Sequence, residues 1–173
     1  MEAPGLRALR LMSWCATRHS ASTYSVSTDP FDSTNPVMAL CAEGMAAEGT
    51  PAEALQLFER AWAARRDDFD AAVAAHFLAR HQPTADETLR WNALAVRHAE
   101  AVSDGRAAAM MASLYLNLGD AQANVGDAEA AAASARHADA HLAAVPDGGY
   151  REFVALGVRR LAARVGGAAD AES

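Results

Sequence analysis

Lysine is absent from this sequence, so all 15 of its basic residues are arginines. We attribute this to a coding bias toward G and C, and the abundance of arginine is therefore no evidence for phosphate recognition. Acidic residues outnumber the basic ones, and the formal net charge is −7 at pH 7. Nucleic acids and anionic membranes both bind basic surfaces. The composition therefore predicts a partner that is neither a nucleic acid nor a membrane.

Cysteine is scarce as well, because Cys15 and Cys41 are the only two. They are too few for a disulfide framework or a zinc motif, and free thiols fit a reducing cytoplasm. No apolar run approaches the roughly 18 residues of a transmembrane span. β-Branched residues nowhere alternate with polar ones over a useful length, as a strand requires. These absences predict an all-helical cytoplasmic protein without a cofactor.

The first residues differ in composition from the rest of the chain. Residues 19–34 are rich in serine and threonine, as a linker is. The stretch before them is Arg-rich and acid-poor like a targeting peptide, but Arg10 interrupts its apolar segment and no clear cleavage site follows. We expect residues 1–34 to be a disordered leader and linker, or upstream sequence included by a wrong start codon. Residues 166–173 are expected to form a disordered tail.

Capping residues mark where the helices begin. Asn35 precedes Pro36 in the order of a helix cap and a first-turn proline. Capping boxes, in which a threonine is followed three residues later by glutamate, open two further helices at Thr50 and Thr84. With the spacing of apolar residues, these signals predict helices from 36 to Gly49, from 51 through Trp62, over 67–80, from 84 through Val96, and over 106–125, 127–144 and 150–165.

The predicted helices pair, and the second helix of each pair carries small residues at matching positions. These are Ala54 and Ala61, Thr88 and Ala95, and Ala131 and Ala138. Ala54 and Thr88 are 34 residues apart, and Thr88 and Ala131 are 43 apart. This predicts a 34-residue period with about nine residues inserted near 98–106. In the first helices the small position falls at Ala42, His76, Gly119 and Gly157, after large residues such as Tyr115 with Leu118 and Phe153 with Leu156.

This pattern resembles the tetratricopeptide repeat (TPR), whose small residues let two helices approach while large ones fill the space beside them. The resemblance covers about residues 35–165, and the segment 79–92 is also similar to a group of small actinobacterial repeat proteins. It implies antiparallel hairpins in a right-handed solenoid, with about three repeats and a C-terminal capping helix. The buried stripe of that last helix is expected to hold Tyr150, Phe153, Val154, Val158, Leu161 and Val165.

The TPR resemblance also implies a function, because the family binds proteins or peptides in a concave groove lined by first-helix residues, without catalysis. By register, the groove residues here are Glu43, Asp70, Val73, Phe77, Arg80, Asn117, Asp120, Asn124 and Val158. The set is acidic and rich in amides around Phe77. It lacks the basic cluster with which some members clamp a terminal carboxylate, so we expect a different class of peptide.

The histidines allow other interpretations. His76 should lie at the contact between the helices of its own hairpin, and His81 is about 140° further around the helix, so the two cannot chelate as an i,i+4 pair. Packing in the corner, a ligand contact by Arg80 and His81, and a metal or catalytic role all remain open. His137 and His141 do share a face, but no HExxH pattern or nearby cysteine completes a metal site. We predict a solvated face there, and no metal.

Three functions are compatible with the sequence. The first is a non-catalytic interaction module with a protein or peptide partner, which the groove residues favour. The second is a small helical enzyme or small-molecule binder with a pocket near His76, Arg80 and Trp91. The third is a regulatory adaptor that responds to a ligand.

Overall fold

The computed structural model describes residues 34–171, and in that range the chain is helical with no strand. The predicted all-α class is confirmed. The α-helices are α2 (Pro36–Ala46), α3 (Pro51–Ala63), α4 (Asp68–Ala79), α5 (Ala85–Ala101), α6 (Met111–Asn124), α7 (Ala128–His141) and α8 (Gly149–Ala171). The predicted leader, with Cys15, lies outside the described residues except for Thr34.

Most of the predicted helix starts are made by the expected caps. The side chain of Asn35 accepts a hydrogen bond from the backbone N–H of Val37 at 2.9 Å. Thr84 accepts one from the N–H of Glu87 and donates its hydroxyl to the Glu87 carboxylate at 2.9 Å, which is a complete capping box. The box predicted at Thr50 is wrong, because its side chain makes no cap bond. There Pro51 at the first turn supplies the helical φ without it.

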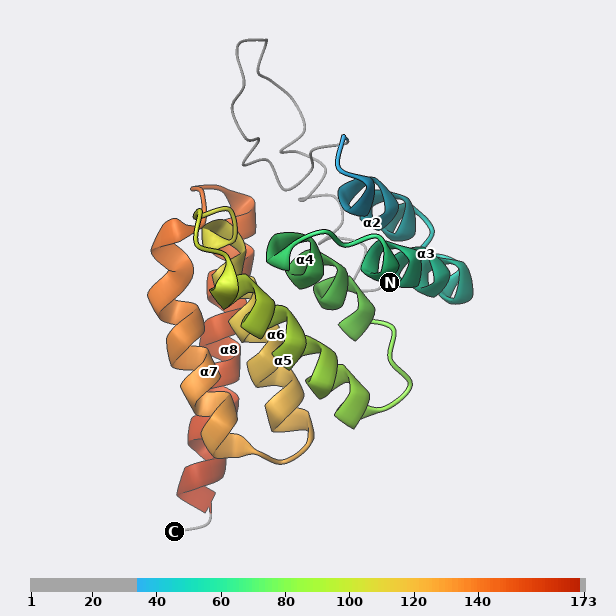
Figure 1. Cartoon of the computed structure of the whole chain (residues 1–173). Coiled ribbons are helices and arrows are strands. Elements are labelled where there is room, and N and C mark those ends of the chain that lie inside the picture. Colours follow the sequence, from blue (N-terminus) through green and yellow to red (C-terminus); the bar gives the residue numbers. More distant parts are fainter. Residues whose placement is uncertain (1–33, 172–173) are drawn as a thin grey trace.

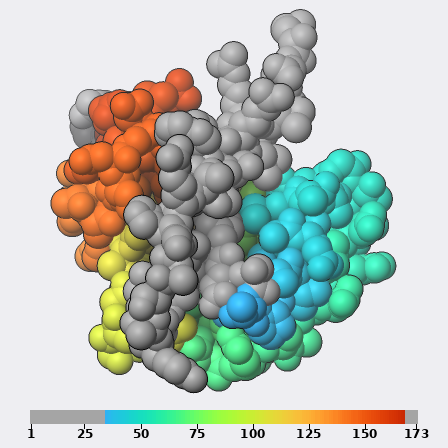
Figure 2. Space-filling model, turned by 90° about the horizontal axis from the view of Figure 1, so that it is seen from above, coloured from blue at the N-terminus to red at the C-terminus, as the bar shows by residue number. Residues whose placement is uncertain are grey.

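Consecutive helices form antiparallel hairpins that stack along the chain (Figure 1). The hairpins are α2 with α3, α4 with α5 and α6 with α7, and α8 packs on α7 and α6. Seen from above, the first hairpin and the last helices lie on opposite sides of the molecule (Figure 2). The first helices α2 and α4 pack directly, as do α6 and α8, whereas α4 and α6 share few close backbone approaches.

Small residues allow the close helix contacts that the sequence predicts. Ala54 and Ala131 are both fully buried. A Cβ added at Gly119 would lie 3.1 Å from Ser134 Cβ and 3.3 Å from the carbonyl oxygen of Ala131 on α7. The absence of a side chain at Gly119 therefore lets α6 and α7 approach each other.

The register predicted for α2 is wrong. Ala42, which we expect at the helix contact, is exposed. The close contact is made by Gly44, which is buried and lies directly against the ring of Phe58 on α3. Because Phe58 needs a glycine beneath its ring, the contact shifts by two positions along α2.

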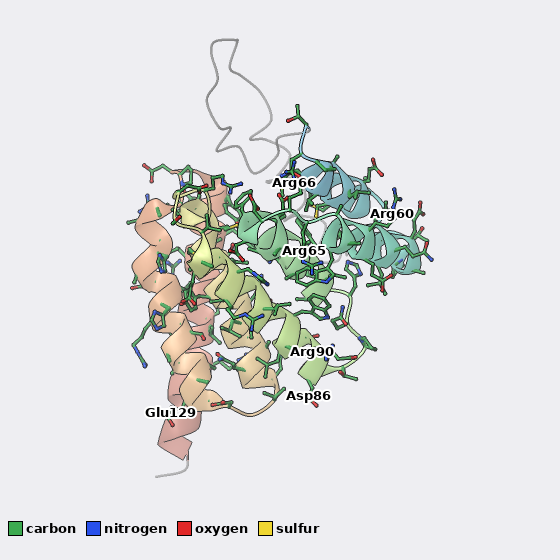
Figure 3. The ribbon with its side chains drawn as sticks, in the orientation of Figure 1. Arg60, Arg65, Arg66, Asp86, Arg90 and Glu129 are labelled. Atoms are coloured by element: carbon green, nitrogen blue, oxygen red, sulfur yellow. The ribbon has the colours of Figure 1, made fainter. Side chains whose placement is uncertain are left out.

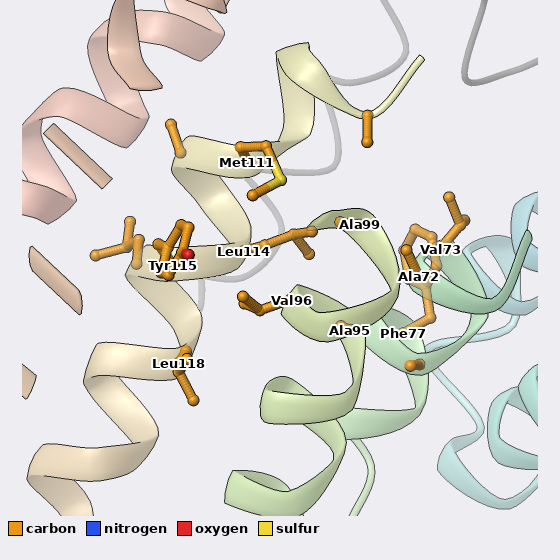
Figure 4. Close-up of a cluster of buried hydrophobic side chains, with 14 of the residues drawn as sticks. Ala72, Val73, Phe77, Ala95, Val96, Ala99, Met111, Leu114, Tyr115 and Leu118 are labelled. Atoms are coloured by element: carbon orange, nitrogen blue, oxygen red, sulfur yellow. The ribbon is translucent and has the colours of Figure 1, made fainter. Parts of the chain in front are cut away.

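The core is continuous from one hairpin to the next. Phe58 stacks on Phe77 of α4 with ring centroids 5.2 Å apart. Figure 4 shows the next part of this core, where side chains of α4, α5 and α6 meet. It contains Ala72, Val73, Phe77, Ala95, Val96, Ala99, Met111, Leu114, Tyr115 and Leu118. The middle hairpin is thus buried from both sides.

The chain between α5 and α6 forms a loop and a short 3-10 turn, Ala108–Met110, and the first residues of the predicted insertion, 98–101, belong to α5. The prediction that the helix begins at Arg106 is therefore wrong, and α6 begins at Met111. Asp104 accepts hydrogen bonds from both the backbone N–H and the side chain of Arg106, which holds the chain in a turn. Arg106 also pairs with Asp67 at 2.8 Å, so the loop is fixed to the start of α4.

The last helix is longer than the sequence suggests. We expect it to end at Val165 and to be followed by a disordered tail, but α8 continues to Ala171. No proline interrupts this stretch, and its alanines are the residue with the highest helix propensity. Only residues 172 and 173 of the predicted tail lie outside the described residues.

Candidate pocket between the first helices

A pocket of about 310 Å³ opens between α4, α5, α6 and α8. It brings together Arg80, Asn117, Asp120 and Asn124, which the sequence assigns to the groove. Its full lining is His76, Ala79, Arg80, Thr88, Asn92, Ser113, Leu116, Asn117, Asp120, Ala121, Asn124, Tyr150, Phe153 and Val154. Two of the helices that line it, α4 and α6, share few close backbone contacts.

Several predicted groove residues are in the core instead, and their assignment to the groove is wrong. Val73, Phe77 and Val158 are at most 6% exposed. Phe77 is buried because it stacks on Phe58, and α4 is covered by neighbouring helices on nearly every side. Glu43 is exposed on α2 but does not line the pocket.

Asp70 is also buried rather than in the groove, with no exposed surface. Its carboxylate accepts hydrogen bonds from the amide of Asn35 at 2.6 Å and from Arg66 Nε at 2.9 Å. These bonds tie the start of α2 to α4, so Asp70 has a structural role. The nearby Cys41 thiol is itself buried, and this burial, with a smaller contribution from the charge of Asp70, raises the pKa of Cys41 to about 12.

His76 lines the pocket and joins two hairpins. The side-chain amide of Asn117 on α6 is 3.3 Å from His76 Nδ1, and the His76 ring meets Phe77 edge-on at 5.0 Å. Burial, with a smaller contribution from the charge of Arg80, lowers the pKa of His76 to about 4. The ring is therefore neutral at pH 7, and Nδ1 can accept from the Asn117 amide. We predicted a contact within its own hairpin, but this hydrogen bond crosses to the next one.

Arg80 is held at one edge of the pocket. Its Nη2 lies 2.8 Å from Glu48 Oε1, just beyond the end of α2. His81 Nε2 is 3.8 Å from the same carboxylate oxygen, and burial lowers the pKa of His81 despite the opposing charge of Glu48. Arg80 is thus paired with a residue that does not line the pocket.

Asp120 is held in the same way at another edge. Its carboxylate pairs with Arg164 of α8 at 3.2 Å. Arg164 also donates to the backbone carbonyl of Asp120 and, at 3.5 Å, to the side chain of Asn124. Burial raises the pKa of the Asp120 carboxyl, while Arg164 opposes the shift.

Asn92 and Ser113 are pocket residues that the sequence reasoning missed. Asn92 is 5% exposed, and its amide donates to the carbonyl oxygen of Thr88 one turn earlier at 3.0 Å. The Ser113 hydroxyl donates to the carbonyl oxygen of Met110 at 2.8 Å. An asparagine four residues after Thr88, on the face that also carries Ala95, is the signal that could have found Asn92.

Phe153 is exposed at the mouth of the pocket. The sequence places it in the buried stripe of α8, but 49% of it is exposed, and Leu156 is 39% exposed. In the repeat register Phe153 matches Tyr115, which α7 covers with the rings of His137 and His141. No helix follows α8 within the described residues, so its matching face stays open.

Of the three residues expected around a pocket, His76 and Arg80 line the pocket described above, but Trp91 does not. Trp91 lies against Trp62 of α3, edge to face, with ring centroids 5.1 Å apart. The guanidinium of Arg65 stacks 3.8 Å from the centre of the Trp62 ring. Figure 3 shows Arg65 with Arg60 and Arg66 in the α3 region of the molecule. Trp91 therefore belongs to a contact between α3 and α5.

His137 and His141 both stack on the ring of Tyr115, at 4.8 and 5.8 Å between centroids. Tyr115 in turn donates its hydroxyl to the carboxylate of Glu100. Among residues 34–171, no group of three or more histidine, cysteine, aspartate or glutamate residues is placed to hold a metal.

Comparisons with protein-family models, curated proteins and solved structures give no match to this chain. The resemblance to TPR proteins therefore rests on the residue pattern alone. Within the described residues, no helix has the length and apolar character needed to cross a membrane.

Proposed function

We propose that this domain is a non-catalytic, TPR-like interaction module that binds an extended segment of a partner protein across α4, α6 and α8. One observation carries the proposal. Polar side chains from helices far apart in the sequence line one pocket. They are Arg80, at the C-terminal end of α4, and Asn117 and Asp120 of α6, and the exposed ring of Phe153 lines the same pocket. A half-exposed aromatic side chain that lines a largely apolar pocket with a few polar groups is typical of a contact surface.

The chemistry of the pocket suits a peptide backbone. An extended peptide presents an N–H donor and a C=O acceptor at each residue. An asparagine side chain offers both complementary groups, and Asn92, Asn117 and Asn124 all line the pocket. Phe153 would add apolar contact area for a side chain of the same segment.

The repeat register supports the same surface. Asn117, Asp120 and Asn124 fall on α6 and Phe153 falls on α8, which are first helices in the TPR-like alignment. TPR proteins use the first helices for their concave groove. The alternative of a small helical enzyme or small-molecule binder is less well supported. His76 and Arg80 line the pocket, but Trp91 packs against Trp62 instead.

The proposal can be tested by selecting binders from a displayed library of random peptides. The selected peptides should bind the wild-type chain and lose affinity for Phe153→Ala and Asn117→Ala. Arg60→Ala on α3 is the control, because Arg60 is exposed and does not line the pocket. A failure to select any peptide, or selected peptides that bind both pocket variants as well as the wild type, would reject the proposed function.

A further inference from the structure

The charged side chains of the pocket are already paired with partners that do not line it. Arg80 pairs with Glu48 at 2.8 Å, and Asp120 pairs with Arg164 at 3.2 Å. Each charge at the rim is therefore balanced before any ligand arrives. A ligand that carried a charge would have to compete with one of these pairs.

The base of the pocket carries no net charge either. His76 is neutral at pH 7 because burial lowers its pKa to about 4. Asn117 contacts it, and Asn92 lies almost completely buried beside Thr88. These groups provide hydrogen-bond donors and acceptors without a charge.

A charged group is a poor match for this environment. Burying a charge without a counter-charge is costly. Arg80 and Asp120 are poor counter-charges for a ligand, because each already has an ion-pair partner at the partly exposed surface. Most of the exposed lining of the pocket is apolar. A purely apolar side chain would still cover the polar atoms of Asn92 and Asn117 without replacing their contacts with water.

A carboxamide meets both requirements. It is uncharged and has two N–H donors and a carbonyl acceptor. Within residues 34–171 the Asn92 side chain makes one hydrogen bond, from Nδ2 to Thr88, so its carbonyl oxygen and second N–H are left for a ligand. Paired amides can satisfy each other's donor and acceptor at once.

The pocket has room for an inserted side chain. At about 310 Å³ it is at the lower end of the range of about 300–1,000 Å³ that small-molecule sites span. Leu116 and Val154 supply apolar surface for the methylene groups of the side chain, while the polar groups lie around them.

We infer that the pocket binds the carboxamide side chain of a glutamine or asparagine in the partner segment, an inference that rests on the proposed function. The carboxamide lies at the base between Asn92 and Asn117, and the peptide backbone crosses the rim at Phe153. Recognition is by matched neutral hydrogen bonds rather than by charge.

Blocked pentapeptides with the sequence Gly-Ala-X-Ala-Gly test this, where X is glutamine, glutamate, lysine or norleucine. Each is titrated at pH 7 into the ¹⁵N-labelled full chain, and the side-chain amide signals of Asn92 and Asn117 are followed. The glutamine peptide should shift these signals saturably. The other peptides should bind about tenfold more weakly or less, since a site built for polar contacts rejects ligands that leave them unpaired. Equal or tighter binding by the glutamate, lysine or norleucine peptide, or no saturable shift with glutamine, would overturn the inference.

Variants locate the interaction. Asn117→Leu should abolish the shift of the Asn92 signal, whereas Gln56→Leu, which removes an exposed amide on α3, should leave it unchanged. A thermal melt shows whether Asn117→Leu is folded, and the change of glutamine to glutamate in the peptide tests the inference without any variant. Library peptides that bind through the pocket with a charged or apolar residue would overturn the carboxamide inference while the proposed function stands. The proposed function fails separately, if no selected peptide depends on the pocket.

Discussion

The side-chain amide of Asn117 lies 3.3 Å from Nδ1 of His76, across the boundary between two hairpins. The helices that carry these residues, α6 and α4, share few close backbone contacts along their length. Both residues line the pocket between α4, α5, α6 and α8. The two residues also set the neutral polar character of the pocket base.

The protonation of His76 should make the protein less stable in mild acid. Its pKa is lowered from 6.5 to about 4 in the folded state, so between these values the unfolded chain binds the proton and the folded chain does not. The free energy of unfolding therefore falls as the pH is lowered from about 6.5 to about 4, by on the order of 2–3 kcal/mol. Denaturant melts across this range should show a weaker pH dependence for His76→Gln. Both proteins keep Arg80 and His81, so the contributions of these residues to the pH dependence are shared. Equal pH dependence of stability in the wild type and His76→Gln would contradict the account.

Overpacking should be costly at the small residues between paired helices. Ala54→Leu forces a larger side chain into a position with no exposed surface, and such substitutions typically cost about 1–3 kcal/mol. Ala52→Leu is the matched control, because Ala52 is exposed on the same helix. If urea melts show the two variants to be equally stable, the hairpin packing is wrong.

Two glycines on neighbouring helices should respond in opposite directions to alanine. At Gly119 a Cβ would lie 2.5 Å from Leu161 Cδ2 and close to α7, so Gly119→Ala should destabilise the fold by about 1–3 kcal/mol. At Gly166 a Cβ meets nothing within 4 Å. Gly166→Ala should therefore stabilise α8 by up to about 1 kcal/mol. Thermal melts compare the two, and a gain at Gly119 or a loss at Gly166 would count against the described helix packing.

Phe77 and Asp70 should behave as structural residues. Phe77→Ala removes a ring that stacks in the core at 5.2 Å from Phe58 and should cost about 3–5 kcal/mol. Asp70→Ala leaves the buried Asn35 amide without its acceptor and should cost about 1–3 kcal/mol. Melts give these losses. If either variant keeps full stability but no longer binds a selected peptide, that residue belongs to the groove after all.

The sequence predicts the helices better than it predicts the faces they expose. Caps such as Asn35 and Thr84 act through atoms a few residues away, so local pattern is sufficient to place helix starts there. The burial of Phe77 depends instead on Phe58 of another hairpin. The repeat register indicates which side of α4 carries Phe77, but not that neighbours cover that side.

The pocket could be predicted only in part for a similar reason. Asn117, Asp120 and Asn124 follow from helical spacing on α6, and they do line the pocket. Phe153 was placed in a buried stripe because its equivalent, Tyr115, is covered by α7. Its exposure depends on there being no helix after α8 in the described chain, which the spacing within α8 cannot show. Asn92 is harder to predict, because a polar residue on the buried face of α5 only interrupts the run of apolar residues that marks that face. The sequence does not show that a pocket lies beside it.

The central claim is that partner binding takes place in the pocket between α4, α6 and α8. The most direct measurement is calorimetric titration of a library-selected peptide into the wild type, Phe153→Ala and Arg60→Ala, with a melt of each protein. Because truncation of a contact hot spot typically costs at least about 2 kcal/mol, Phe153→Ala should weaken binding by more than about tenfold. It should leave stability nearly unchanged, since the ring is 49% exposed, and Arg60→Ala should change neither quantity. Full affinity in Phe153→Ala together with lost affinity in Arg60→Ala would contradict the account.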